Sequence, residues 1–287
     1  MDVISVQSRV KRGYVGNAVA MPVLEATGVT AWAVDTVVYP HHPGHGPASP
    51  KVTEAAALTI SLDEATHRCT SPACLLSGYL VNPEQGRIIL DTLAKARRDK
   101  RIGAYYLDPV FGDDAEGTYV DPALVAFFRD EALPQSTVLL PNRFELAALS
   151  GMSVNNTGDA VSAAHCLLNR GPEIVLVSSV PAETVRERKA LSNLLVSRDG
   201  AWFVSVDALS LRAKGTGDML SAAFCGLHAQ GVSPPEALAY AVSLVDTATT
   251  DAAARDGDEL DLPKILNFLN FSEKELPAHQ IIESLEQ

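Results

Sequence analysis

Apolar residues fall in short alternating or continuous runs, and longer amphipathic stretches separate these runs. Alternating apolar positions predict a first strand over residues 2–7, and Gly13 and Gly16 interrupt the pattern before a helix over 17–27. The same succession continues along the chain. The further strands are predicted over 29–38, 73–80, 102–107, 137–140, 174–178, 191–197 and 201–206, and the further helices over 53–68, 83–101, 122–131, 143–150, 159–169, 217–230, 235–254 and 262–271.

Strands that alternate with helices of this length are typical of an α/β fold with a mostly parallel central sheet and helices on both faces. Residues 41–50 are too rich in proline, glycine and histidine for either element and are predicted to form a loop. The chain shows no strong linker or repeat, so we expect one domain over residues 1–287. In such sheets ligands bind at the carboxyl ends of the strands.

Composition indicates a soluble globular protein, because 47% of the 287 residues are hydrophobic and 20% are charged. The longest apolar runs, such as 174–177, are far shorter than the roughly 20 residues that cross a bilayer. The first residues lack the features of a signal peptide, so we expect a cytoplasmic protein. The net charge of −12 and the scattered basic residues argue against nucleic-acid and membrane partners. The four cysteines form no C-x-x-C pair and are expected to be buried free thiols.

The strongest local signal is the string Lys-Gly-Thr-Gly-Asp-Met-Leu over residues 214–220. Its two glycines permit close backbone approach, and the helix predicted to follow offers unpaired N–H groups and a positive dipole to an anion. Asp218, near the start of that helix, either caps it or acts as a base. The chain contains no Gly-Lys dipeptide, so this is not a Walker A motif.

A second signal follows the strand predicted at 102–107. The string over 108–113 begins and ends with aspartate, and Asp114, Glu116 and Tyr119 lie close behind it. Carboxylates gathered on one loop suit Mg²⁺, although a solvated acidic turn has the same appearance.

A third signal follows the strand predicted at 137–140. Asn142 is placed to cap the next helix, and Glu145 three residues later completes a capping box. A metal-binding role for Glu145 is compatible with that structural role. At the N-terminus, Ser8 and the glycines that follow it form a weaker signal for a polar small molecule.

Taken together in their order along the chain, these strings resemble those of a pyridoxal kinase of the ribokinase-like fold. The resemblance covers about residues 3–255. The Gly-Thr-Gly-Asp string marks the wider superfamily, whereas Ser-Val-Gln-Ser at 5–8 with Gly-Tyr-Val-Gly-Asn at 13–17 points to the vitamin B6 branch. The matching strings lie at 5–17, 35–37, 77–79, 108–113, 141–145, 177–179 and 214–218.

The resemblance implies ATP-dependent phosphorylation of the 5′-hydroxymethyl group of pyridoxal, pyridoxine or pyridoxamine. It also implies Mg²⁺ with ATP, a monovalent cation such as K⁺, and a homodimer. Residue by residue, it assigns Asp218 as the catalytic base, Gly215, Thr216 and Gly217 to an anion hole, Ser8, Tyr39, His42 and Tyr79 to the substrate pocket, Asp108, Asn142, Ser178, Ser179 and Thr216 to ATP, and Asp113, Tyr119 and Glu145 to the metal.

The chain departs from the family at two places. Proline stands at 43, where the family usually has threonine in the loop that faces the substrate ring, and Leu140-Pro141 precedes Asn142, where the family often has threonine. Other readings therefore stay open: a hydroxymethylpyrimidine or sugar kinase of the same fold, or a B6-binding regulatory protein that has lost turnover. A Rossmann oxidoreductase is disfavoured, because no G-x-G-x-x-G string follows the first strand.

Overall fold

The computed structural model describes residues 1–69, 72–185, 188–209, 213–266 and 283–285. Within these ranges the strands run as follows: β1 Asp2–Val10, β2 Thr30–Tyr39, β3 Lys51–Val52, β4 Ala73–Ser77, β5 Ile102–Leu107, β6 Gly112–Asp113, β7 Gly117–Thr118, β8 Val138–Leu139, β9 Ile174–Val185, β10 Arg188–Ser197, β11 Gly200–Asp207 and β12 Glu283–Leu285. The α-helices are α1 Asn17–Ala26, α2 Ala55–Arg68, α3 Pro83–Arg98, α4 Pro122–Phe127, α5 Arg143–Ser150, α6 Thr157–Leu168, α7 Thr216–Ala229, α8 Pro234–Ala254 and α9 Leu262–Leu266.

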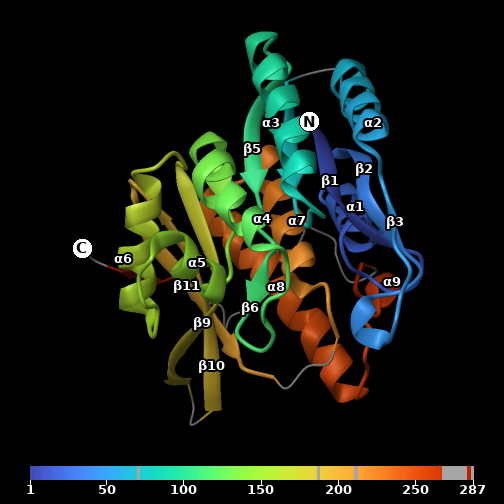
Figure 1. Ribbon diagram of the computed structural model, residues 1–287. Coiled ribbons are helices and arrows are strands. Elements are labelled where there is room, and N and C mark those ends of the chain that lie inside the picture. Colours follow the sequence, from blue (N-terminus) through green and yellow to red (C-terminus); the bar gives the residue numbers. More distant parts are fainter. Residues whose placement is uncertain (70–71, 186–187, 210–212, 267–282, 286–287) are drawn as a thin grey trace.

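One sheet has the strand order β12-β11-β10-β9-β8-β5-β4-β1-β2-β3, while β6 and β7 form a separate hairpin. The centre of the sheet, from β2 to β9, is parallel. Both of its margins are antiparallel. The predicted α/β class with a mostly parallel sheet is therefore confirmed. All parallel strands end at the same edge, which in Figure 1 is the lower edge toward which the arrow of β5 points.

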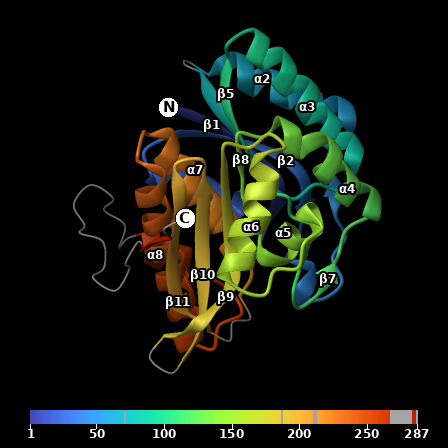
Figure 2. The ribbon, with the colours of Figure 1, turned by 90° about the vertical axis from the view of Figure 1, so that its left-hand side faces the viewer.

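Helices cover both faces of the sheet, as Figure 2 shows. One hydrophobic core joins the sheet to α2, α3, α4, α5 and α6, and the other joins it to α1, α7, α8 and α9. Strand β4 is buried at every position, as expected for a strand with helices on both sides. The prediction of one domain over residues 1–287 stays a prediction, although the sheet takes strands from both ends of the chain.

Several elements differ from the sequence-based expectation. The strand predicted at 174–178 continues to Val185, because the antiparallel β10 pairs with it along its length. The helix predicted over 122–131 is α-helical only to Phe127 and then passes into a π-turn over Phe128–Ala132 and a 3₁₀ turn over Leu133–Gln135. Strands β3, β6, β7 and β12 contain two or three residues each, too few to show periodicity.

Three further predictions concern the loop at 41–50, the helix at 262–271 and the cysteines. The loop at 41–50 contains one 3₁₀ turn, Pro43–His45. The helix predicted over 262–271 is seen as α9 to Leu266, and its remainder lies outside the described residues. The prediction of four buried cysteines is wrong for Cys166, which is exposed on α6 and lies outside the stripe of buried residues on that helix.

No α-helix within the described ranges combines the length and the apolar character that crossing a bilayer requires.

The loop before α7 is seated directly on the loop before α1. Gly215 has φ +91°, and a Cβ atom at this position would lie 1.9 Å from the backbone oxygen of Tyr14. Gly16 has φ +55°, and its Cβ would lie 2.1 Å from the backbone oxygen of Ser8. Both positions need glycine for conformation and for space, so these two loops fix each other.

We expect Gly215→Ala to lower the free energy of unfolding by about 2–4 kcal/mol, because alanine adds a left-handed backbone strain to a backbone clash. Gly217→Ala is the matched control in the same loop: nothing lies within 4 Å of its Cβ position and its φ is not in the left-handed region. That change should leave stability the same or raise it slightly. Urea unfolding of both variants measures the difference, and equal stability would contradict the close approach of the two loops.

Candidate functional site

Asp218 lies in the first turn of α7, and its carboxylate faces the loop before α1. Its Oδ2 accepts a hydrogen bond from the backbone N–H of Gly16 at 2.8 Å, across 202 residues of sequence. The N-cap of α7 is Gly215, where no side chain caps the helix. Burial raises the pKa of the Asp218 carboxyl to about 6, against the opposing effect of the Gly16 amide. Asp218 is therefore ionised near neutral pH yet basic enough to accept a proton.

A second carboxylate, Asp108, lies directly after β5 and is buried. The hydroxyl of Ser221 donates a hydrogen bond to its Oδ2 at 2.6 Å. Burial and the negative charge of Asp218 raise the pKa of Asp108 to about 7. The site thus holds two carboxylates that are close enough to oppose each other's ionisation.

The predicted capping box at the start of α5 is present. Glu145 accepts hydrogen bonds from the backbone N–H groups of Phe111 (2.9 Å), Gly112 (3.4 Å) and Asn142 (2.9 Å), and the Asn142 side chain accepts from the Glu145 N–H. The Asn142 amide also donates to the backbone oxygen of Gly112 at 2.7 Å. Burial and the charge of Asp108 raise the pKa of Glu145 well above its usual range. Glu145 therefore ties the start of α5 to the turn after β5.

The acidic segment after β5 forms the β6–β7 hairpin. Asp113 accepts hydrogen bonds from the N–H groups of Ala115 (2.9 Å) and Glu116 (2.7 Å), so it organises the turn of the hairpin. Two cations hold this hairpin from different elements: Arg143 of α5 pairs with Asp114, and the Lys214 amine lies 2.6 Å from Glu116. The hairpin is thereby anchored at the carboxyl ends of the strands.

Tyr119 follows the hairpin, and 43% of the residue is exposed. Partial burial of its hydroxyl, followed by the charges of Glu145 and Asp108, raises its pKa. In the part of the chain that the structure describes, no three His, Cys, Asp or Glu side chains are grouped so that they could hold a metal ion. A metal role for Asp113, Tyr119 and Glu145 stays a prediction.

A β-bulge places Ser178 and Ser179 beside Asn142. Across β9 and β10 the register shifts between Ser192 and Leu194, and Ser179 has φ +60°. The backbone of Ser178 pairs with Asn142 and donates to the Pro141 oxygen at 3.0 Å. The bulge therefore lies within β9, where the strand passes the start of α5, and bulges are frequent next to functional sites.

The predicted substrate residues meet at the ends of three adjacent strands. Ser8 lies near the end of β1, Tyr39 ends β2, and Tyr79 follows β4, while β1 pairs with both neighbours. The Tyr39 and Tyr79 hydroxyls share a hydrogen bond, and burial together with this neighbour raises the pKa of Tyr79 to about 12. Ser8 Oγ lies against Gly16.

His42 lies in the loop at 41–50 and is half-buried, with Lys214 and Glu116 among its charged neighbours. Its Nδ1 accepts a hydrogen bond from the Gly44 N–H at 3.0 Å, so the ring proton is on Nε2. Burial, followed by the charge of Lys214, lowers the pKa of His42. His42 is therefore neutral at pH 7 and has one N–H to donate. His45 is exposed and lies 3.6 Å from Asp258 and 3.8 Å from Glu259.

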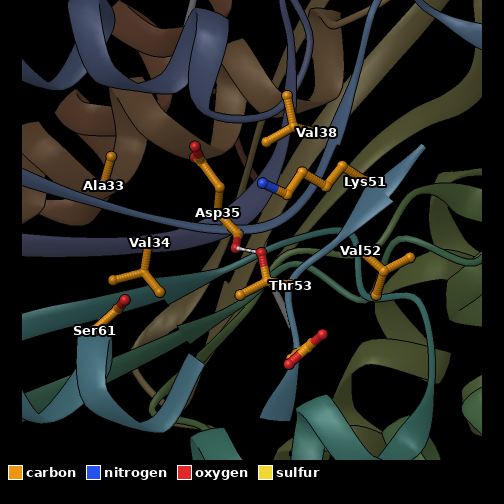
Figure 3. A pocket seen from close by; sticks show the side chains of 9 residues that line it. Ala33, Val34, Asp35, Val38, Lys51, Val52, Thr53 and Ser61 are labelled. Atoms are coloured by element: carbon orange, nitrogen blue, oxygen red, sulfur yellow. Dashed lines mark hydrogen bonds between the residues drawn. The ribbon is translucent and has the colours of Figure 1, made fainter. Parts of the chain in front are cut away.

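An open cavity of about 560 Å³ lies elsewhere, at the margin of the sheet between β2, β3 and α2 (Figure 3). It contains none of the predicted site residues. The lining residues are Ala33, Val34, Asp35, Val38, Lys51, Val52, Thr53, Glu54 and Ser61.

Sequence reasoning missed two functional contacts at the site. Ser221 is three residues after Asp218, one helical turn along the same face, and that spacing was a usable signal. The Gly16 amide was recognised only as part of a glycine loop, because no sequence pattern tells which carboxylate a backbone N–H binds.

Comparisons with known proteins show the family and the fold. A family model described as phosphomethylpyrimidine kinase matches residues 71–259. The pyridoxal kinase PdxY of Rubrobacter xylanophilus is 33% identical over 264 residues, which is 91% of each chain. Two solved structures share the fold. Pyridoxal kinase from Entamoeba histolytica superposes with a TM-score of 0.86 at 20% identity, and the Leishmania donovani enzyme in complex with ADP and pyridoxine with 0.83 at 24%, each over 99% of both chains.

The raised pKa of Asp108 predicts that this carboxylate destabilises the protein at neutral pH. The unfolded carboxyl has a pKa of about 3.9, so between pH 4 and 7 the native state binds more protons and stability falls as the pH rises. Asp108→Asn removes this penalty and keeps an oxygen that accepts from Ser221. We expect the variant to be more stable by on the order of 1–3 kcal/mol at pH 7.5, and much less so at pH 4.

Thermal unfolding at the two pH values measures the effect. Asp121→Asn is the matched control, because it removes one negative charge from an exposed helix N-cap at which asparagine serves as well as aspartate. An advantage of Asp108→Asn that is the same at pH 4 and pH 7.5 would contradict the raised pKa.

Proposed function

Because the chain belongs to the pyridoxal kinase family, we propose that it transfers the γ-phosphoryl group of ATP to the 5′-hydroxymethyl group of pyridoxal. Pyridoxine and pyridoxamine are the related acceptors. The position of Asp218 carries the proposal: a carboxylate with a pKa of about 6 lies in the first turn of α7, beside a two-glycine loop. The ribokinase-like α/β fold provides the frame for this site.

In the proposed reaction Asp218 accepts the hydroxymethyl proton while the oxygen attacks the γ-phosphorus. The bond from phosphorus to the bridging oxygen breaks, and ADP leaves. Gly215, Thr216 and Gly217 lie at the start of α7, where free N–H groups and the helix dipole stabilise charge on the transferred group. Such a transfer depends on alignment and charge neutralisation more than on covalent chemistry.

We propose that Asp108, Asn142, Ser178, Ser179 and Thr216 contact ATP. The β9 bulge and the capping box support this assignment, because they bring the two serines within β9 next to Asn142, which follows β8.

A magnesium ion bound with ATP fits the acidic character of this site. Asp108, Glu145 and Asp218 lie close enough for their charges to raise pKa values within the group, so a cation is needed before a triphosphate can enter. When bound, Mg²⁺ neutralises phosphate charge, and it takes most of its ligands from phosphates and water. We assign Asp113, Tyr119 and Glu145 to the metal side. The oxygen atoms of Glu145 already accept three N–H groups, so Glu145 contributes chiefly through its charge. A monovalent cation such as K⁺ is also part of this proposal.

For the vitamer we propose a pocket of Ser8, Tyr39, Tyr79 and His42. The neutral His42 donates its Nε2–H to the substituted pyridine ring. The loop at 41–50 closes over the ring and excludes water, which otherwise competes as a nucleophile.

We further propose that the protein is a homodimer in the cytoplasm. The family resemblance supports both statements, and the net charge of −12 argues against a nucleic-acid partner. Light scattering after gel filtration tests the dimer.

The phosphomethylpyrimidine kinase model that matches residues 71–259 favours a second candidate acceptor, a hydroxymethylpyrimidine. Coupled ADP release with the three B6 vitamers, a hydroxymethylpyrimidine and a panel of sugars separates these activities. Highest kcat/KM for a vitamer supports the proposal, and highest kcat/KM for the pyrimidine overturns it. No ADP release with any acceptor would indicate a binding protein.

Asp218→Asn should lower kcat for pyridoxal by about 10²–10⁴-fold, because the amide keeps the shape of the side chain but cannot accept a proton. Nucleotide affinity should stay near that of the wild type. Asp199→Asn, on the exposed β10–β11 turn, controls for the loss of one negative charge. Steady-state kinetics and ATP titration test this, and a kcat near the wild-type value would remove Asp218 from the role of base.

His42→Ala should raise the KM for pyridoxal by about 3- to 10-fold, the cost of one hydrogen bond, and leave the KM for ATP unchanged. ATP hydrolysis without vitamer should rise if the loop no longer closes. In the wild type the pyridoxal KM should increase only as the pH falls through the lowered pKa of His42, since the ring is neutral above it. His41→Ala, whose Nδ1 contacts only the neighbouring backbone oxygen of His42, is the control. Unchanged values for His42→Ala would leave the loop without a role at the substrate.

A further inference from the structure

A group of hydrogen-bonded polar side chains adjoins the loop before α1, whose Gly16 N–H binds the Asp218 carboxylate. We propose that Asp35 is a positioning residue for Asp218 and acts through the Asn17 side chain and the Gly16 backbone. The proposal rests on the proposed role of Asp218 as the base. It concerns how the chain aims that carboxylate, since neither Asp35 nor Asn17 contacts Asp218 directly.

Asp35 joins three elements through one carboxylate. Arg9 Nε of β1 donates to its Oδ1 at 3.1 Å and to its Oδ2 at 2.9 Å, and Asn17 Nδ2 of α1 donates to Oδ1 at 2.8 Å. Thr53 binds instead the backbone oxygen of Asp35, at 2.7 Å, and Figure 3 shows the carboxylate extending away from Thr53. The side chain of Asp35 therefore connects the end of β1 to the start of α1.

Asn17 is fully buried, and its amide is held on every side. Its Oδ1 accepts from the Ser5 hydroxyl at 2.7 Å. Its Nδ2 also approaches the backbone oxygens of Val34 (3.3 Å) and Ser5 (3.4 Å), both longer than the 2.8 Å bond to Asp35. Asp35 is thus the shortest acceptor for this amide, and its carboxylate makes the bond charge-assisted. Without it, a buried N–H group loses its best partner, and Nδ2 keeps the longer contacts to the Val34 and Ser5 oxygens.

Gly16 transmits the position of Asn17 to Asp218. The two residues are consecutive, so a displacement of Asn17 moves the backbone of Gly16, which packs so closely on β1 that an added Cβ would lie 2.1 Å from the Ser8 oxygen. Its N–H donates to Asp218 Oδ2 at 2.8 Å and opposes the rise in the Asp218 pKa that burial causes. A shift of Asn17 therefore weakens a hydrogen bond that keeps the Asp218 carboxylate ionised and oriented.

Loss of the Asp35 contact is therefore expected to change turnover and the pH dependence of turnover. If the Gly16 bond weakens, Asp218 holds its proton to a higher pH and is less well aligned. The other ionisable groups that face Asp218 are Asp108 at the end of β5 and Tyr119 after β7, and the variants below leave both unchanged. A merely structural role for Asp35 would lower stability without moving the pH profile.

The test compares Asp35→Ala with Asp35→Asn. Alanine removes the acceptor for Asn17, whereas asparagine keeps an oxygen for Asn17 and replaces the charge and the second oxygen, which accepts from Arg9, with a neutral NH2 group. We expect Asp35→Ala to lower kcat about 5- to 20-fold, to leave the KM for ATP within 2-fold, and to move the acidic limb of the kcat–pH profile to higher pH. Asp35→Asn should restore kcat to within about 3-fold of the wild type.

Glu131→Ala is the control, because it removes the acidic partner of another arginine–carboxylate pair, in which Arg87 Nε and Nη2 bind the two oxygens of Glu131 on the surface. It should leave kcat and the pH profile unchanged. Should Asp35→Ala not fold, Asp35→Ser carries the same expectation, since its hydroxyl is too short to replace the carboxylate.

A second readout does not depend on kinase activity. In the free wild-type protein the amide resonance of Gly16 should titrate with Asp218, with a midpoint near pH 6. In Asp35→Ala the midpoint should rise or the titration should be lost, and in Asp35→Asn it should be retained. Wild-type kcat, pH profile and Gly16 titration in Asp35→Ala would overturn the proposal, as would equal losses in the alanine and asparagine variants. If Asp218→Asn keeps full turnover while the Gly16 titration responds to Asp35, the assignment of the base fails and the positioning contact stands.

Discussion

The close approach of the loop before α1 to the loop before α7 is the constraint on which the site depends. The two segments come from opposite ends of the sequence, yet the backbone of Tyr14 lies where any side chain at 215 would stand. This approach puts the Gly16 N–H within 2.8 Å of Asp218. Gly16 and Gly215 therefore determine which groups come together here, because only glycine permits such a close approach.

The same edge of the sheet concentrates negative charge. Asp108, Glu145 and Asp218 come from the ends or beginnings of different elements, and burial raises the pKa of each. Such a group is unfavourable for the free protein and becomes useful only when cations and phosphates enter. These carboxylates thus lower the free energy of unfolding at neutral pH, and they suit the site to the cations that accompany the proposed substrate.

Local rules predicted much of this molecule. The capping box of Asn142 and Glu145 and the bounds of α5 follow from residues three positions apart, and β5 follows from a continuous apolar run. The β9 bulge, the π-turn after α4 and the pairing of β11 with β12 do not follow, because each depends on partners distant in sequence. For the candidate site, the rule that ligands bind at strand ends selected segments that the structure places at one edge of the sheet. It did not predict that three backbone amides occupy Glu145, since burial and tertiary packing decide which donors reach a carboxylate.

The proposed base lies on a tightly packed helix, α7, whereas the proposed substrate loop at 41–50 is loosely packed. The nine residues from Met219 to Leu227 are all buried, so the helix that carries Asp218 is held in place by the core. For the proposed base at Asp218, this means that the acceptor is brought to a fixed helix. The segments that face the proposed ring position are different in kind: the loop at 41–50 has little buried apolar surface, and its 3₁₀ turn has no buried residue. In the proposed reaction, a carboxylate on a fixed helix beside an adaptable loop lets the ring contacts vary while the geometry of phosphoryl transfer stays fixed. This is consistent with Pro43 replacing the usual family residue in the cover while the Gly-Thr-Gly-Asp string at 215–218 is intact.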